Sequence, residues 1–152
     1  MTSSTPENHL TRLAGTWTGT ETIAASKWGP GGMALATLSA RADLNGRVLI
    51  QDYNAERDGK RWLAAHAVFT FDEPSSTYTL FWFDSLGFTP SQPAAGEWDG
   101  ETLKFLRISP RGQTRHLYTF PNGDEFALRL ESSFDGGSTW NLVMEGRYSR
   151  NK

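Results

Sequence analysis

The sequence predicts an all-β protein: a closed antiparallel meander barrel of about ten strands with a short N-terminal helix. Turn signals, many of them Asn-Gly or Asp-Gly pairs, recur along the 152 residues. Such pairs supply the positive φ angles that tight hairpins need. Between the turns, apolar and polar residues alternate, as they do in strands that bury one face. A long meander leaves exposed edges unless the sheet closes on itself, so a barrel is favoured over an open sheet.

One segment with a helical pattern lies within residues 1–14, and we expect it to cap one end of the barrel. Thr5 can serve as its N-cap, and Pro6 suits the first helical position. Leu10 and Leu13 are three residues apart, so they share the face that would pack on the barrel.

The pieces between the turns predict ten strands in a single domain that covers residues 1–152, because no repeat or change in composition divides the chain. A segment with two prolines and little pattern, residues 85–96, is interpreted as a long loop that leads to the short sixth strand. The expected strands are residues 16–25, 33–44, 47–55, 62–72, 78–84, 95–98, 103–108, 115–121, 126–134 and 140–148.

Alternation assigns several polar and aromatic side chains to the inner face of the barrel. In the last two strands the even-numbered positions are apolar, which directs Trp140 and Met144 inward. The same pattern in the strand at 115–121 places His116 and Tyr118 on the apolar face. A row of threonines forms one face of the first strand, so Glu21 either points inward or lies hydrated near the rim.

An alanine-rich face in the second strand includes Ala36 and Ala40. Small residues at inward positions either relieve crowding against a bulky wall, such as the aromatic run around Trp82, or line a ligand cavity. Tyr53 shares one face of the third strand with Leu49 and Gln51. The fourth strand has apolar residues on both faces, so His66 is an interior residue only if the even-numbered positions point inward.

Composition excludes several classes of function. The chain has no cysteine, which excludes disulfides, thiolate zinc sites and cysteine catalysis. Its net charge is −2, and it lacks the positive surface of a nucleic-acid-binding protein. No apolar run reaches the ~20 residues of a membrane span, and the first residues do not form a secretory signal. We therefore expect a cytoplasmic protein with neither nucleic acid nor membrane as a partner.

The three histidines of the chain, His9, His66 and His116, share no metal-ligand spacing, so no metal site is predicted. A single interior histidine, His116 or His66, could ligate the iron of a haem within the aromatic wall. The alternative is an ordinary hydrogen-bonded histidine in the core or at the rim.

The tripeptide Gly15-Thr16-Trp17 resembles the G-x-W signature of the calycin superfamily, which includes the lipocalins and fatty-acid-binding proteins. In those barrels the tryptophan closes one end, and an arginine from the region of the last strand packs across it. The resemblance implies this role for Arg147 or Arg150. Fatty-acid-binding proteins also hold a carboxylate with an Arg-x-Tyr pair, and that pair is absent here because Arg147 and Tyr148 are adjacent.

A wider set of motifs is similar to a bacterial family catalogued as domain of unknown function 1579, over residues 10–150. This resemblance implies the barrel fold and supplies no activity or functional residues. The motifs are Leu44-Asn45-Gly46-Arg47, Gln51-Asp52-Tyr53, YTLFWFDSL from Tyr78, the segment from Gly96 to Leu103, and Met144-Glu145-Gly146-Arg147-Tyr148.

The predicted function is binding of a small, largely apolar molecule in the barrel interior. One alternative is an enzyme that acts on such a molecule by proton transfer between Glu21 and His116. Another is a barrel that is only a scaffold and self-associates as a homodimer through the loop at 85–96, with Leu86 and Phe88 at its tip. The expected ligand-binding residues are Glu21, Ala36, Ala40, Tyr53, His66, Trp82, His116, Tyr118, Trp140 and Met144.

Overall fold

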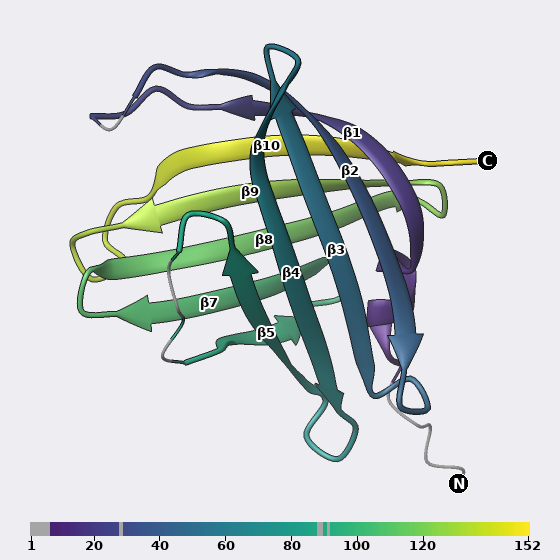
Figure 1. Ribbon diagram of the computed structural model, residues 1–152. Helices are drawn as coiled ribbons and strands as arrows, with labels where there is room; N and C mark the ends of the chain where they lie inside the picture. Colours follow the sequence, from purple (N-terminus) through teal and green to yellow (C-terminus); the bar gives the residue numbers. More distant parts are fainter. Residues whose placement is uncertain (1–6, 28, 88–89, 91) are drawn as a thin grey trace, which may run out of the picture.

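The computed structural model describes residues 7–27, 29–87, 90 and 92–152, and ten antiparallel strands close into one barrel (Figure 1). Each strand pairs with its neighbours in the chain, and the last strand pairs with the first. The predicted fold class is therefore confirmed. The strands are β1 (Gly15–Ile23), β2 (Gly32–Asp43), β3 (Val48–Arg57), β4 (Lys60–Asp72), β5 (Thr77–Asp84), β6 (Ala94–Trp98), β7 (Thr102–Ser109), β8 (Gly112–Asn122), β9 (Glu125–Ser133) and β10 (Asn141–Arg150).

Turn chemistry explains why the strands end where they do. The β3–β4 hairpin turns at Asp58 (φ 54°) and Gly59 (φ 75°). Two successive positive φ angles match the right-handed twist of the flanking strands, and Asp-Gly adopts them at low cost. The segment between β5 and β6 is longer, as expected, and Phe88 within it lies outside the described residues.

The N-terminal helix is a short 3-10 helix, η1 (His9–Leu13). Asn8 is its N-cap, and the Asn8 side chain accepts a hydrogen bond of 3.0 Å from the backbone N–H of Leu10. The helix thus starts later than predicted, and the expected cap and first helical residue, Thr5 and Pro6, lie outside the described residues. Among the described residues, no helix has the length and apolar character to span a membrane.

Trp17 and Arg150 close the barrel end on which η1 packs. The Trp17 indole is buried and donates to the carbonyl of Leu13 at 3.0 Å. The Arg150 guanidinium lies 4.2 Å from the centre of the Trp17 ring and donates to the carbonyl of Ala14 at 2.6 Å. Arg150, and not the exposed Arg147, therefore makes the cation–π contact.

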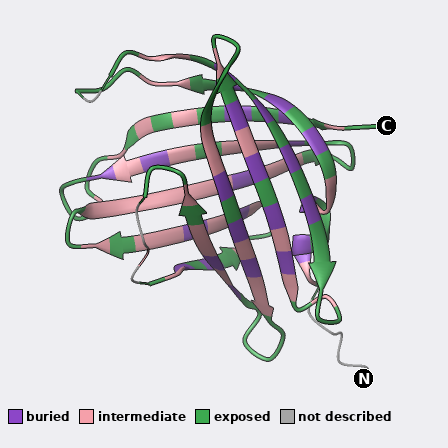
Figure 2. Ribbon diagram, in the orientation of Figure 1, coloured by how far each residue is buried: buried purple, intermediate pink, exposed green. Residues whose placement is uncertain are grey.

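Buried residues alternate with exposed ones along β2 and with mostly half-buried ones along β3 (Figure 2). The alanine-rich face of β2 points inward from Ala34 to Ala40. The sequence left open which face of the fourth strand points inward. In the structure the odd-numbered residues of β4 face the interior. Near η1 the interior is packed with aromatic rings, such as Phe69 and Phe105 at 5.6 Å between centroids.

Candidate functional site

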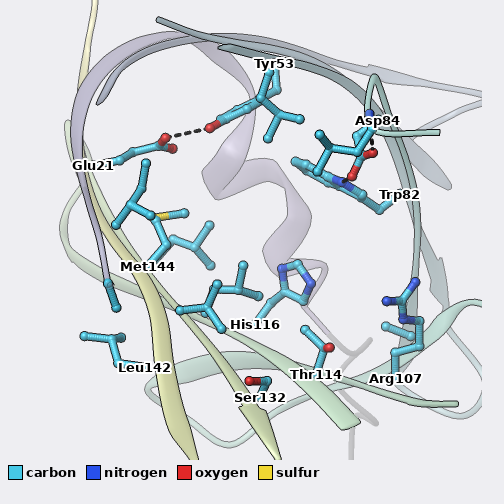
Figure 3. A pocket seen from close by; sticks show the side chains of 18 of the residues that line it. Glu21, Tyr53, Trp82, Asp84, Arg107, Thr114, His116, Ser132, Leu142 and Met144 are labelled. Atoms are coloured by element: carbon cyan, nitrogen blue, oxygen red, sulfur yellow. Dashed lines mark hydrogen bonds between the residues drawn. The ribbon is translucent and has the colours of Figure 1, made fainter. Parts of the chain in front are cut away.

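The half of the barrel away from η1 contains a cavity of about 840 Å³ (Figure 3). Tyr118 and Phe126, which also contact the packed aromatic core, form its inner end. Residues after β1, β5 and β9 contribute its rim. The volume is within the range of small-molecule sites. The walls are mainly apolar and include Leu38, Leu63, Leu80, Trp82, Ala94, Leu128, Leu130, Leu142 and Met144.

Glu21 lies in the cavity wall with no solvent-exposed surface. Its Oε1 accepts a hydrogen bond from the Tyr53 hydroxyl at 2.6 Å, and its Oε2 accepts one from the Tyr148 hydroxyl at 2.6 Å. Figure 3 shows the hydrogen bond between the side chains of Tyr53 and Glu21 in the cavity wall. The three side chains come from β1, β3 and β10, so this cluster spans the seam where the first and last strands pair.

Two glycines make room for the Tyr148 side chain. A Cβ atom at Gly146 would lie 2.2 Å from the Tyr148 hydroxyl oxygen, and one at Gly19 would lie 2.3 Å from Cδ1 of the ring. Gly146 pairs directly with Glu21 across the β1–β10 seam. The absence of side chains at these two positions therefore lets the Tyr148 hydroxyl reach the carboxylate.

Among the described residues, the hydrogen-bond partners of the Glu21 carboxyl group are the uncharged hydroxyls of Tyr53 and Tyr148. Burial raises the pKa of Glu21 above the ordinary value of 4.5, while the hydroxyls of Tyr148 and Tyr53 act in the opposite direction. Burial, and then the negative charge of Glu21, raise the pKa of both tyrosines far above 10. They consequently remain neutral donors. Across the described residues, no Lys, Arg or His side chain forms an ion pair with Glu21.

His116 enters the cavity from β8, between aromatic neighbours. Its ring centroid lies 6.3 Å from that of Trp82 and 6.4 Å from that of Tyr118. Burial, with a further effect of the Arg107 guanidinium, lowers the pKa of His116 to about 4, so the ring is neutral near pH 7. Within the part of the chain that is described, His116 Nδ1 and Gln51 Nε2 are buried without a hydrogen-bond partner.

Charged groups gather nearer the mouth. Lys27, Asp84 and Arg107 all line this part of the cavity. The indole N–H of Trp82 donates to Asp84 Oδ2 at 2.9 Å, which fixes the orientation of the ring (Figure 3). Leu86, at the start of the segment after β5, is largely exposed and also lines the cavity.

The structure brings six of the ten predicted site residues together around the cavity. Ala36 and Ala40 are buried on β2 without lining it. Glu21 and His116 line the same cavity from different strands with no hydrogen bond between them. The six lining residues are Glu21, Tyr53, Trp82, His116, Tyr118 and Met144.

Two expected site residues lie on the outer surface. The His66 side chain is 77% exposed and its Nδ1 lies 2.7 Å from Asp52 Oδ1, so the interior alternative for His66 is wrong. Trp140 packs against the Arg115 guanidinium, at 3.9 Å from the ring centroid. The inward direction predicted for Trp140 is wrong: Trp140 precedes β10, and a register shift between Leu142 and Met144 interrupts the alternation from which its direction was predicted.

Sequence reasoning missed Tyr148, Gln51 and Arg107 as cavity residues. Tyr148 has the same parity as Met144, and the glycine two positions before it is the signal that could have identified it. Gln51 is a polar residue on the same buried face as Tyr53. Among the described residues, no group of three or more His, Cys, Asp or Glu side chains is arranged to hold a metal ion.

Comparisons with known proteins agree with this architecture. The model of the family described as "Protein of unknown function (DUF1579)" matches residues 2–150. The crystal structure of Rv2717c from M. tuberculosis is similar, with a TM-score of 0.73 and 16% identity over 94% of this chain and 95% of that chain. The S-type phycobiliprotein lyase CPES from Guillardia theta has a TM-score of 0.70 and 9% identity over 98% of this chain and 94% of that chain.

At these identities the two solved structures show a shared fold alone. No curated protein matches the sequence. The family model spans nearly the whole chain. This protein, a closed ten-stranded antiparallel barrel, therefore belongs to the DUF1579 family of proteins of unknown function.

Proposed function

We propose that the protein binds a small, largely apolar molecule in the barrel cavity. The single observation that carries this proposal is the cavity of about 840 Å³ beside a tightly packed aromatic core in the same barrel. Larger side chains at small or medium positions of the wall, such as Ala94 and Leu38, would fill this space. A barrel that served only as a scaffold would gain stability from such filling, since packed interiors are more stable than hollow ones.

The lining is suited to an apolar molecule with a few polar atoms. Its walls are mainly aliphatic and aromatic, and its polar groups are few and come from different strands. Binding sites for small molecules typically combine such walls with a small number of placed polar groups. One protein with the same fold is named as a lyase, which supports the use of this architecture for a site that acts on another molecule.

Native mass spectrometry of the purified protein, compared with its denatured mass, is the first test. Extra mass that leaves on denaturation would support the proposal and give the size of the bound molecule. The mass of haem together with a Soret band would identify haem, which the interior histidine His116 would ligate.

A second test uses the uncharged fluorophore Nile red and a matched pair of variants. We expect Ala94→Trp, which fills the cavity, to weaken Nile red binding by about tenfold or more. Ala42→Trp places the same side chain on the exposed end of β2 and should bind like the unmodified protein. Met144→Trp is a second filling variant in case Ala94→Trp does not fold. Equal binding by the filling and control variants, or no binding by the unmodified protein, would overturn the proposal.

A further inference from the structure

We propose that the bound molecule is an apolar amine whose ammonium group pairs with Glu21, an inference that rests on the proposed function of the cavity. The starting point is the incomplete hydrogen bonding of the carboxylate. Each of its oxygens accepts one hydrogen bond from a tyrosine hydroxyl. A carboxylate has about four lone-pair sites, so about two acceptor positions remain.

The second step is the missing positive charge. A buried carboxylate is costly unless it is paired with a cation. The tyrosine hydroxyls contribute no charge, and His116, the histidine in the cavity wall, is neutral near pH 7. Lys27 lines the cavity from the segment after β1, and Arg107 lines it from β7. Among the ion pairs of the described residues, none involves Glu21. A ligand ammonium would supply the charge that the described residues around Glu21 do not.

The third step is the aromatic surface beside the carboxylate. Tyr53, which donates to Glu21, lies 5.6 Å from Trp82 between ring centroids. Ring faces attract cations, most strongly when both are removed from water. An ammonium at this place would contact aromatic surface as well as the carboxylate, whereas a ligand carboxylate would be repelled by Glu21.

Access to Glu21 requires a neighbouring side chain to move. Met144 pairs with Ile23 across the β1–β10 seam, two residues from the pair formed by Glu21 and Gly146, and it lines the same cavity. Figure 3 shows Met144 beside Glu21. Methionine is unbranched with three rotatable side-chain bonds, so it can change rotamer to admit a ligand head group.

Three ligands with the same chain length test this inference at pH 7: dodecylamine and dodecanoate, each below its critical micelle concentration, and 1-dodecanol, below its solubility limit. Their competition with Nile red gives the three dissociation constants. We expect the amine to bind about tenfold or more tightly than the alcohol, and the carboxylate to bind most weakly. Glu21→Gln should bring the amine-to-alcohol ratio close to one and keep the binding of the alcohol. Glu145→Gln, which alters an exposed carboxylate on the outer face of β10, should keep the original ratio.

The outcomes separate this inference from the proposed function. If the unmodified protein binds the alcohol or the carboxylate as tightly as the amine, the inference is wrong while the cavity remains a binding site. If Nile red and all three ligands fail to bind, the proposed function is overturned together with the inference. The comparison of the three ligands on the unmodified protein tests the preference for an amine even if Glu21→Gln does not fold.

Discussion

Gly146 leaves the space in which the Tyr148 hydroxyl reaches Glu21. A Cβ atom there would meet the Tyr148 hydroxyl at 2.2 Å, so Gly146→Ala should displace the ring and break its bond to Glu21. We expect a loss of about 1–3 kcal/mol in the free energy of unfolding, measured by urea denaturation. Gly123→Ala is the matched control, because a Cβ at Gly123 would have no heavy atom within 4 Å. Equal losses for the two variants would contradict this account.

The ionisation of Glu21 should also affect how stability depends on pH. Burial raises its pKa above the 4.5 expected in the unfolded chain, so the folded state holds the proton more tightly. The resulting contribution to stability is fully present below pH 4.5 and is lost as the pH rises through the raised pKa of the folded state. The groups that face Glu21 are the hydroxyls of Tyr53 and Tyr148, which stay neutral over this range.

Glu21→Gln removes this titration. Relative to the unmodified protein, the variant should gain stability as the pH rises from 4.5 through the raised pKa of Glu21 in the folded state. Urea denaturation of both proteins at several pH values measures this difference, and the lost hydrogen-bond geometry contributes only a constant offset. A difference that does not change with pH would rule out a raised pKa for Glu21.

At the scale of the element, the two tryptophans that were predicted to line the cavity lie in different places. Trp140 lies against Arg115 outside the barrel, whereas Trp82 on β5 lines the cavity. We therefore expect Trp82→Leu to weaken Nile red binding by several-fold and Trp140→Leu to leave it unchanged. Fluorescence titration of the two variants makes the comparison directly. Weaker binding by the Trp140 variant would place that ring in the site.

The same elements show what could be predicted from the sequence. Asp58-Gly59 and similar pairs located the hairpins because only certain residues adopt positive φ angles. Regular alternation placed His116 on the inner face and left Glu21 either inward or hydrated near the rim, and both residues line the cavity. Alternation failed for Trp140, because this residue precedes β10 and because the register shift near the start of β10 depends on its pairing with β9, which the sequence does not reveal. Alternation left the direction of the His66 side chain undecided, because both faces of β4 carry apolar residues. The contact between Tyr148 and Glu21 joins residues that are 127 positions apart, and alternation alone does not reveal such a contact.

At the scale of the whole molecule, Arg150 holds the closed end of the barrel together. It donates to the carbonyls of Ala14 and Gly123 and lies over the ring of Trp17. Arg150→Gln should lower the free energy of unfolding by about 2–4 kcal/mol, because charged hydrogen bonds and a cation–π contact are lost together. Arg147→Gln alters an exposed arginine of the same strand. This substitution should change the free energy of unfolding by less than about 0.5 kcal/mol. Urea denaturation compares the two, and similar effects would argue against this role for Arg150.

The pairing of β1 with β10 also has a consequence for how the protein acquires its site. Trp17 pairs with Arg150, so the barrel closes through a contact between distant parts of the chain. Such contacts form slowly, since a large loop must be ordered before they stabilise anything. During synthesis, the nine earlier strands can pair in order, but the wall that joins Glu21 to Tyr148 requires β10. A nascent chain would therefore have no complete cavity until its last strand had left the ribosome.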